Sequence, residues 1–392
     1  MRSRSLSLIA LVVASVVAVP WLSMAQQPIR IGASLSITGR FALQGGYVRE
    51  GYLLCQKHVN ERGGVLGRTI EFLIRDDGSD PKTAVGLYEK LITEDKVDAV
   101  MGPYSSPITD AVADVTEKHR KLMVAPVAGT TSIWEKGRRY LVMVLSPLEV
   151  LLEGVIDLAA RNGLKSIALI NEDALAPRAV VRGGLALAKK KGLEVVFHEA
   201  YPTGISNFAP ILNKVKAAQP DVLVAAAPPD GAVAITGRGK ELDVNVKMFS
   251  SLPGGAYPDY YKRLGKTADF VYTGSYWEPG LPYPGNREFV EAYQKEFNRV
   301  PSDNSAASYA GCQLFMEAVR RAGSLDSDKV REEILKLRTK TIFGDFAVDE
   351  RGFQVGHKPV TIQWQDGKQV VVWPDEVAAG KPRFPTPPWS QR

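Results

Sequence analysis

The chain has 392 residues, of which 45% are hydrophobic and 23% are charged, so it is long enough for two or three globular domains and is neither disordered nor fibrous in composition. Its formal net charge of +6 is modest and its basic residues are dispersed, which excludes a protein that binds nucleic acid through a strongly basic surface. Its two cysteines and four histidines are too few and too scattered for a disulfide scaffold or a zinc site of common spacing.

The first 25 residues have the three parts of a secretory signal peptide. Arg2 and Arg4 form a positive start, residues 6–19 form a short apolar stretch, and the small residues Ser23 and Ala25 precede a cleavage site. The apolar stretch is shorter than the roughly 20 residues that a membrane anchor needs. We therefore expect cleavage after Ala25 and a soluble protein in the periplasm.

Beyond the leader, strands and helices alternate, which is typical of a parallel sheet with helices on both faces. The first α/β unit is predicted as strand 29–35, helix 44–62, strand 69–75, helix 81–94, strand 99–101, helix 109–119 and strand 122–125. A second unit follows as helix 148–162, strand 166–170, helix 179–191, strand 194–200, helix 208–218, strand 221–226, helix 232–241 and strands 247–250 and 270–275. The sequence therefore predicts an α/β protein with two such units in succession.

The last part of the chain breaks this alternation. Helices are predicted at 286–298, 305–322 and 327–337, and strands at 360–364 and 369–373. Asp366-Gly367 lies between the two strands, and this dipeptide strongly favours a hairpin. Residues 382–392 are rich in proline, and we expect them to be disordered.

No complete catalytic motif is present in the sequence. A partial phosphate-binding loop at 264–267 lacks its first glycine, and there is no Gly-x-Ser-x-Gly nucleophile elbow. Asp76-Asp77 and Glu172-Asp173 each follow a predicted strand, and we interpret them as a turn and a polar loop. The sequence indicates no enzyme, no catalytic residue, no metal site and no cofactor.

Polar turns follow two successive strands of the first unit. The motif GPYSS at 102–106 follows one strand and precedes a helix, and the motif AGT at 128–130 follows the next. Ligands of open parallel sheets bind outside the carboxyl ends of the strands, and hydroxyl and N–H groups at a helix start favour carboxylates. A simple helix cap is the alternative, but two such turns favour a ligand site. The candidate contacts are Tyr104, Ser105, Ser106, Ala128, Gly129 and Thr130.

The motif VNERGGVLG at 59–67 is followed and preceded by further matches at 32–39, 76–81, 102–106 and 344–352. Together these motifs resemble the type I periplasmic solute-binding proteins that serve ABC importers of the branched-chain amino acid class. The resemblance extends from about residue 29 to residue 374, which is nearly the whole chain after the leader.

The resemblance implies two Rossmann-like lobes that close on a ligand by a hinge motion. The first lobe would comprise residues 26–146 and 279–343, the second 147–278 and 344–375, with crossovers near Ser146, 277–279 and 343–346 and a flexible tail at 376–392. It also implies a monomer that delivers a small-molecule ligand to an ABC permease in the inner membrane. An exported ligand sensor of the same fold is the alternative, and an α/β enzyme is a more remote one.

The family's ligand site carries over unevenly to this chain. Ser105 matches the first-lobe serine, but apolar residues replace the second-lobe aromatic and acidic residues with which the family often holds an amino acid. These second-lobe candidates are Ala176, Pro177, Pro228, Pro229, Leu252 and Pro253, beside Asp230. Burying an ammonium without an acidic partner is costly, so the resemblance implies a small carboxylate with an apolar or aromatic body. Asp230 is the residue that would restore ammonium recognition, and Phe41 and Tyr104 offer either ring contacts or loop packing.

The two cysteines lie on helices that the resemblance assigns to one lobe. Cys55 falls in helix 44–62 and Cys312 in helix 305–322. An exported protein permits a disulfide between them, and two buried unpaired cysteines are the other, slightly favoured interpretation. A Cα separation above about 7 Å would exclude the bond.

Overall fold

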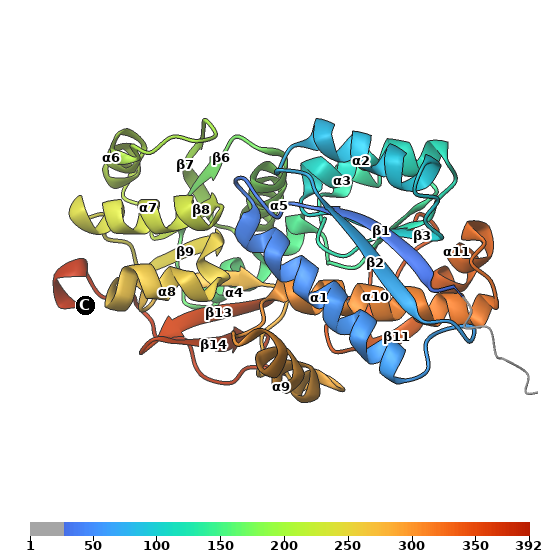
Figure 1. Cartoon of the computed structure of the whole chain (residues 1–392). Coiled ribbons are helices and arrows are strands. Elements are labelled where there is room, and N and C mark those ends of the chain that lie inside the picture. Colours follow the sequence, from blue (N-terminus) through green and yellow to red (C-terminus); the bar gives the residue numbers. More distant parts are fainter. Residues whose placement is uncertain (1–26) are drawn as a thin grey trace, which may run out of the picture.

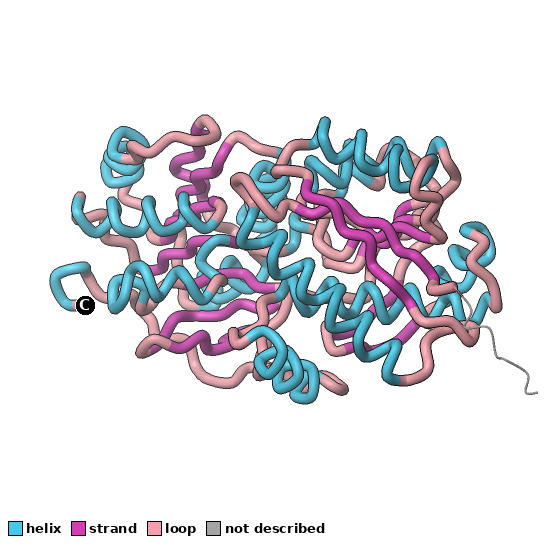
Figure 2. The backbone as a smooth tube through the Cα atoms, in the orientation of Figure 1, coloured by secondary structure: helices cyan, strands magenta, loops and turns pink. Residues whose placement is uncertain are grey.

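The computed structural model describes residues 27–392, and the predicted leader and its cleavage site lie outside this part of the chain. The molecule has two α/β lobes, each built on a central sheet with helices against it (Figures 1 and 2). This confirms the predicted fold class. None of the helices in residues 27–392 has the length and apolar character that crossing a bilayer requires.

The first lobe contains a parallel sheet in the order β2-β1-β3-β4-β5. Its strands are β1 (Ile29–Leu35), β2 (Ile70–Asp76), β3 (Ala99–Met101), β4 (Met123–Ala125) and β5 (Leu141–Met143). Its helices are α1 (Ala42–Glu61), α2 (Pro81–Thr93), α3 (Ser106–Lys118), α10 (Asp303–Ala322) and α11 (Ser327–Lys336). The residues of β3, β4 and β5 are all buried, because helices cover both faces of the sheet.

The second lobe contains a sheet in the order β14-β13-β10-β9-β8-β6-β7, in which β13 runs antiparallel to both of its neighbours, β10 and β14. Its strands are β6 (Ser166–Glu172), β7 (Glu194–Tyr201), β8 (Val222–Ala227), β9 (Met248–Pro253), β10 (Tyr272–Ser275), β13 (Val360–Gln365) and β14 (Lys368–Trp373). Its helices are α4 (Glu153–Arg161), α5 (Leu175–Lys191), α6 (Ala209–Ala218), α7 (Pro229–Glu241) and α8 (Pro258–Leu264). The predicted hairpin forms, and Asp366 and Gly367 take the positive φ angles, +50° and +79°, that its tight turn requires.

Three helices begin three or four residues earlier than the sequence predicted. The starts of α3, α5 and α7 each include a proline in the first turn, namely Pro107, Pro177 and Pro229. Proline breaks a helix interior but suits the first turn, where its missing N–H is not needed. The earlier starts place these three helix ends at the gap between the lobes.

Several short elements were not predicted. They are β5, α8, β11 (Arg338–Thr341) and β12 (Gly344–Ala347). The helix α9 (Asn286–Phe297), in contrast, lies where it was predicted. The strands β11 and β12 have four residues each and contain no apolar run, so only their pairing defines them.

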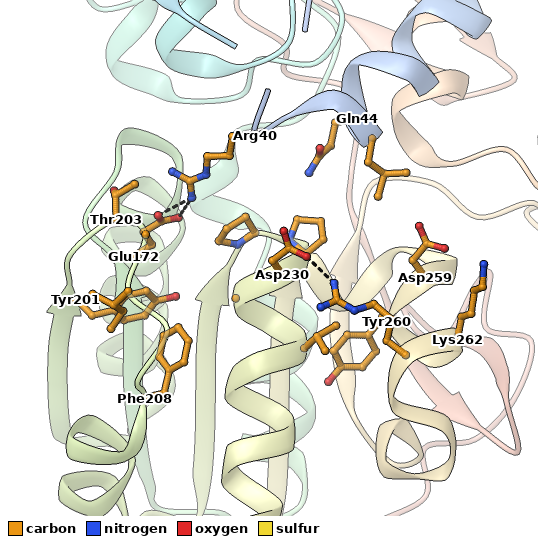
Figure 3. A pocket seen from close by; sticks show the side chains of 18 residues that line it. Arg40, Gln44, Glu172, Tyr201, Thr203, Phe208, Asp230, Asp259, Tyr260 and Lys262 are labelled. Carbon is orange, nitrogen blue, oxygen red and sulfur yellow. Dashed lines mark hydrogen bonds and ion pairs between the residues drawn. The ribbon is translucent and has the colours of Figure 1, made fainter. Parts of the chain in front are cut away.

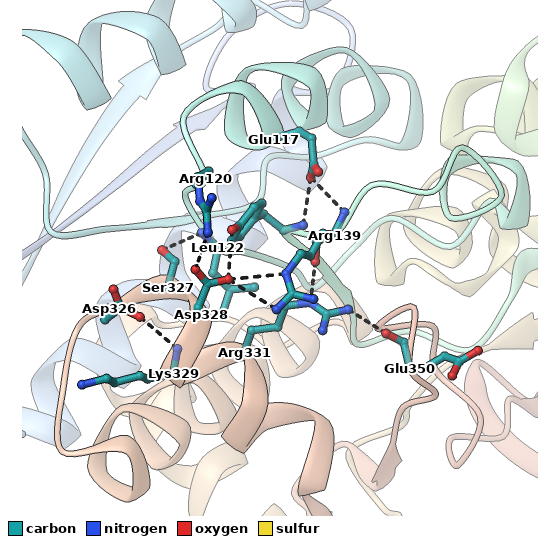
Figure 4. Close-up of polar contacts among 11 residues, drawn as sticks. Glu117, Arg120, Leu122, Arg139, Asp326, Ser327, Asp328, Lys329, Arg331 and Glu350 are labelled. Atoms are coloured by element: carbon teal, nitrogen blue, oxygen red, sulfur yellow. Dashed lines mark hydrogen bonds and ion pairs between the residues drawn. The ribbon is translucent and has the colours of Figure 1, made fainter.

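After the second-lobe α/β unit, the chain returns to the first lobe, and a network of polar contacts fixes α11 there (Figure 4). Asp328 on α11 accepts hydrogen bonds from Arg120 at 2.8 Å and from the Tyr140 hydroxyl at 2.9 Å. These partners hold the pKa of the Asp328 carboxyl below its usual value, the Arg120 hydrogen bond being the largest cause. Arg331 donates to the carbonyl oxygens of Arg139 and Glu350, both at 2.6 Å. Residues before and after the second lobe thus join in one network.

A disulfide joins Cys55 on α1 to Cys312 on α10, with Cα atoms 6.3 Å apart. The slightly favoured interpretation of two unpaired cysteines is therefore wrong. The two helices pack directly on each other in the first lobe, and both cysteines are fully buried (Figure 1). Because 257 residues separate the cysteines, no local sequence signal reports this contact.

The chain passes between the lobes at three places, and His357, which lies in the third, contacts the other two. Its Nδ1 lies 3.1 Å from Ser146 Oγ, its Nε2 lies 3.1 Å from the Tyr276 carbonyl oxygen, and its ring stacks on Phe343 at 4.6 Å. Burial lowers the pKa of His357 to about 4, so the ring is neutral at physiological pH. One uncharged side chain therefore packs where the passages meet.

The third passage lies later than the predicted 343–346. Met143 N at the edge of the first-lobe sheet donates to the Gly352 carbonyl oxygen at 2.8 Å, and Gln354 Nε2 donates to the Val144 carbonyl oxygen at 3.0 Å. Residues 344–354 thus still pack on the first lobe, and the chain reaches the second lobe at Val360. The Val348–Gln354 bridge folds this segment back on the first lobe.

The proline-rich tail is ordered on the second lobe, so the expectation of disorder is wrong. Trp389 is buried and its Nε1 donates to the Val244 carbonyl oxygen at 2.8 Å, while Thr386 N donates to the Lys247 carbonyl oxygen at 2.9 Å. Proline content alone does not cause disorder when a large aromatic side chain can be buried.

Replacing Glu278 with glutamine is expected to flatten the dependence of stability on pH. Glu278 lies buried in the second passage, and burial raises its pKa to about 8, with the nearby Asp303 carboxylate acting in the same direction. The unfolded value is about 4.3, so the folded state holds the proton more tightly and the free energy of unfolding falls as pH rises from about 5 to about 8. Glu278→Gln removes this loss, and at pH 8.5 the variant should exceed the wild type by at least about 1 kcal/mol.

Urea unfolding at pH 5.5 and pH 8.5 measures this difference. Glu288→Gln on exposed α9 is the matched control and should keep the wild-type pH dependence. An identical pH dependence in Glu278→Gln and wild type would contradict a neutral Glu278.

Candidate functional site

A cavity of about 80 Å³, here called the inner cavity, lies between the lobes. Segments that follow β1 and β3 of the first lobe and segments that end or follow β6, β8 and β9 of the second lobe line it. Its apolar wall is formed by Phe41, Tyr104, Pro107, Leu148, Ala174, Leu175, Ala176, Pro177, Val180, Pro228, Pro229, Pro253 and Tyr257. Its polar residues are Arg40, Ser105 and Glu172. The carboxyl ends of both sheets therefore face one site, as the rule for open parallel sheets requires.

The structure brings many of the predicted site residues together at this cavity. Those that line it are Phe41, Tyr104, Ser105, Ala176, Pro177, Pro228, Pro229 and Pro253. Five others are buried near the same strand ends but line neither this cavity nor the larger one that adjoins it: Ser106, Ala128, Gly129, Thr130 and Leu252.

Ser105 offers a free hydroxyl at the start of α3. It is the N-cap residue, yet its side chain caps no N–H group of the helix. Its Oγ is buried and has no hydrogen-bond partner within residues 27–392, and the same is true of Thr130 Oγ1. A helix N-terminus attracts negative charge, so the Ser105 hydroxyl is placed to donate to a ligand carboxylate.

Aromatic rings form the first-lobe wall of the inner cavity. Phe41 and Tyr104 meet edge to face at 5.4 Å, and the Arg40 guanidinium lies 5.3 Å from the centre of the Phe41 ring. Tyr257 enters from the second lobe, and its hydroxyl accepts from Asn304 Nδ2 at 2.6 Å. Burial raises the pKa of both Tyr104 and Tyr257, so their hydroxyls stay neutral. This wall suits the flat face of an apolar or aromatic group.

An ion pair crosses from one lobe to the other beside the cavity. Arg40 Nη2 of the first lobe lies 2.5 and 2.6 Å from the two carboxylate oxygens of Glu172 on β6 (Figure 3). The Glu172 side chain is only 4% exposed. The interpretation of Glu172 as part of a polar loop is therefore wrong, whereas Asp173 is exposed and pairs with Arg178.

Asp76 and Asp77 hold the loop that carries Arg40 and Phe41. Asp77 is fully buried and accepts from Ser34 Oγ at 3.0 Å and from Ser36 Oγ at 2.8 Å. Asp76 accepts from the backbone N–H groups of residues 37 and 38, in addition to the predicted turn at Gly78. These two carboxylates thus position the loop that carries Arg40 and Phe41.

A second, larger cavity of about 610 Å³ adjoins the first and is here called the outer cavity (Figure 3). The two cavities share Arg40, Glu172, Pro228 and Pro229 as walls. Asp230 lines the outer cavity, where its side chain is 88% exposed and lies 2.5 Å from Arg263. Asp230, the residue that was expected to restore ammonium recognition, therefore lies outside the inner cavity and is already paired with Arg263.

The sequence did not identify several residues of these cavities, namely Arg40, Gln44, Glu172, Tyr201 and Tyr257. A usable signal existed for some of them, since Arg40 and Tyr257 come shortly after the carboxyl ends of β1 and β9. The Arg40–Glu172 pair has no such signal, because 132 residues separate its members. Within the described residues, no three His, Cys, Asp or Glu side chains are grouped to hold a metal ion.

Comparisons with known proteins agree on one family. A family model described as a periplasmic binding protein matches residues 28–369. Leu/Ile/Val-binding protein homolog 7 of Brucella suis is 26% identical, with 96% of this chain and 99% of that protein covered. Leu/Ile/Val-binding protein homolog 8 of Brucella abortus is 25% identical, with 91% and 93% covered.

Two solved structures are similar in fold. An ABC transporter solute-binding protein from Rhodopseudomonas palustris, in complex with 3,4-dihydroxybenzoic acid, has a TM-score of 0.78 and 25% identity, covering 87% of this chain and 95% of that one. A leucine-binding protein from Thermotoga maritima has a TM-score of 0.80 and 21% identity, covering 88% and 97%.

Proposed function

Because the chain belongs to the periplasmic binding protein family, we propose that it binds a small carboxylate with an apolar or aromatic body between its lobes and delivers it to an ABC permease. The observation that carries this proposal is the pairing of charges at the inner cavity. Among the described residues that line that cavity, Glu172 alone has a carboxylate, and Arg40 already occupies it. No acidic group is left there for the ammonium of a free amino acid.

Two groups of residues at the inner cavity support the two halves of this ligand. Ser105 Oγ and the start of α3 offer hydrogen bonds to a carboxylate, and such charge-assisted bonds contribute about 1.5–3 kcal/mol each. The rings of Phe41 and Tyr104 and the second-lobe residues Ala176 and Pro253 offer apolar contact to the ligand body. The Rhodopseudomonas neighbour binds an acid of this kind, whereas the Brucella relatives carry the name of aliphatic amino acids.

Calorimetric titration of the mature protein, refolded from denaturant to remove any bound ligand, tests the ligand class. The panel contains benzoate, 3-phenylpropanoate and cyclohexanecarboxylate beside leucine, valine and phenylalanine. We expect binding of acids without an amino group and weak or no binding of the amino acids. Tight binding of leucine or valine with every simple acid inert would contradict the proposal and favour an amino acid receptor.

Ser105→Ala should weaken the binding of the preferred acid by about 10- to 100-fold, because it removes one hydrogen bond to a charged group. The stability of the free protein should stay the same, since the Ser105 side chain caps nothing in the structure. The neutral amide of the same acid is the matched control, and the substitution should weaken its binding less, because a hydrogen bond to a neutral carbonyl is weaker than one to a carboxylate. Equal affinity of both proteins for the acid would exclude Ser105 from carboxylate binding.

Export and delivery complete the proposal. Removal of the leader after Ala25 would release a monomer into the periplasm, as the family's location supports. Uptake by the partner permease in proteoliposomes separates transport from the alternative, an exported ligand sensor. Recovery of the bound ligand unchanged separates both from an enzyme.

A further inference from the structure

The inner cavity is small for the ligand that its chemistry favours. Its volume of about 80 Å³ is below the roughly 150 Å³ of an engineered protein cavity that holds benzene. The outer cavity, at about 610 Å³, falls within the usual range of about 300–1,000 Å³ for small-molecule pockets. Because the two cavities share four lining residues, a ligand that occupies the inner cavity has room to extend into the outer one.

Two buried polar groups of the outer cavity lack partners. Gln44 in the first turn of α1 is 2% exposed, and its Oε1 has no hydrogen-bond partner in the part of the chain that the structure describes. Tyr201 at the end of β7 is 5% exposed, and its hydroxyl is likewise unpaired among residues 27–392. Buried polar groups in proteins are nearly always hydrogen-bonded, so an unpaired group that lines a cavity needs a partner from outside the protein, which is water or a ligand.

These two groups approach the outer cavity from opposite lobes. The amide of Gln44 points from α1 towards the second lobe, and the phenol of Tyr201 points from β7 towards the start of α7 (Figure 3). The first-lobe and second-lobe sides of the cavity therefore each offer one unpaired neutral group.

The charges of the outer cavity leave a neutral partner as the best fit. Arg40 pairs with Glu172, and Asp230 pairs with Arg263. The two other charged residues of the lining, Asp259 and Lys262, have opposite signs. An amide and a phenol both donate and accept hydrogen bonds, and burial keeps the phenol protonated by raising the pKa of Tyr201. The matching ligand group is one that also donates and accepts, which is a hydroxyl or a carboxamide.

We propose that the outer cavity is a second subsite for the same ligand, in which Gln44 and Tyr201, one from each lobe, bind hydroxyl or carboxamide groups that lie beyond the apolar body of the ligand. The proposal rests on the proposed function for the inner half of the ligand. It adds a substrate class: elongated carboxylic acids that carry a neutral hydrogen-bonding group beyond their apolar body.

A pair of acids that differ by one hydroxyl tests the subsite. Calorimetry compares 3-phenylpropanoate with 3-(4-hydroxyphenyl)propanoate on the wild type, Gln44→Leu and Tyr201→Phe. The hydroxyl should increase the affinity of the wild type about 10-fold, and substitution of the residue that contacts it should remove most of that gain. The affinity for 3-phenylpropanoate should change less than about twofold in either variant. Tyr201→Phe keeps the edge-to-face contact with Phe208, whose ring centre lies 5.1 Å away.

Thermal unfolding of the free variants gives a readout that distinguishes ligand binding from a structural role. Because neither Gln44 nor Tyr201 donates or accepts a side-chain hydrogen bond within the described residues, their substitution should leave the melting temperature unchanged or higher. An unchanged hydroxyl gain in both variants, or equal affinity of the wild type for the two acids, would overturn the subsite while leaving the proposed function intact. Binding of neither acid, with leucine or valine bound instead, would overturn the proposed ligand class and this subsite with it.

Discussion

Replacing Cys55 and Cys312 with alanine is expected to lower the free energy of unfolding by about 2–5 kcal/mol. The disulfide joins α1 to α10 and closes a loop across a sequence separation of 257 residues, so its loss frees a very large unfolded chain. Both cysteines are fully buried, which adds the loss of packed sulfur atoms to the entropic effect. Since the bond connects the two segments of the first lobe, that lobe should be the part destabilised most.

Urea unfolding with and without dithiothreitol measures this effect. The wild type should lose stability in the reductant, and the Cys55→Ala/Cys312→Ala double variant should be insensitive to it. Thiol counting on the denatured protein provides the chemical control, with two thiols appearing only after reduction. Two reactive thiols in the unreduced, denatured wild type would show that the bond does not form.

Replacing Ala176 with tryptophan is expected to reduce ligand affinity by more than about 100-fold. Ala176 lies in the first turn of α5 and lines the inner cavity, which has a volume of only about 80 Å³. An indole at this position would occupy the space of the ligand body and hold the two lobes apart. Because the side chain enters a gap between lobes rather than a packed core, we expect each lobe to remain folded.

Lys190→Trp is the matched control for this substitution. Lys190 lies near the end of the same helix, where it is exposed to solvent. It should leave both ligand affinity and melting temperature unchanged. Calorimetry with the preferred acid measures both variants, and full binding by Ala176→Trp would show that the ligand lies elsewhere.

The strands and helices with a clear hydrophobic period were predictable from sequence. The bounds of β1 and β3 are the predicted ones, because each is an apolar run next to a turn signal. Proline concealed the starts of α3, α5 and α7, and the short strands β11 and β12 carry no period of their own. Burial of Trp389 orders the tail, which composition alone did not indicate.

The sequence predicted only part of the site. The position of residues after the carboxyl ends of strands was enough to name Ser105, and the family resemblance named Ala176 and Pro253; all three line the inner cavity. The Arg40–Glu172 ion pair and the unpaired group of Gln44 depend on how the two lobes approach each other. Contacts of this kind follow from the packed structure and leave no periodic or motif signal in the sequence.

The disulfide between α1 and α10 also makes a large part of the polypeptide a closed covalent ring. After Cys55 the chain completes the first-lobe sheet from β2 to β5, builds the α/β unit of the second lobe from β6 to β10, and returns to the first lobe, where Cys312 lies on α10. A protease that cuts one peptide bond anywhere between these cysteines therefore releases no fragment in an oxidising compartment. Most of the second lobe lies between the two cysteines. A protein that is cut there therefore stays one molecule until a reductant breaks the disulfide.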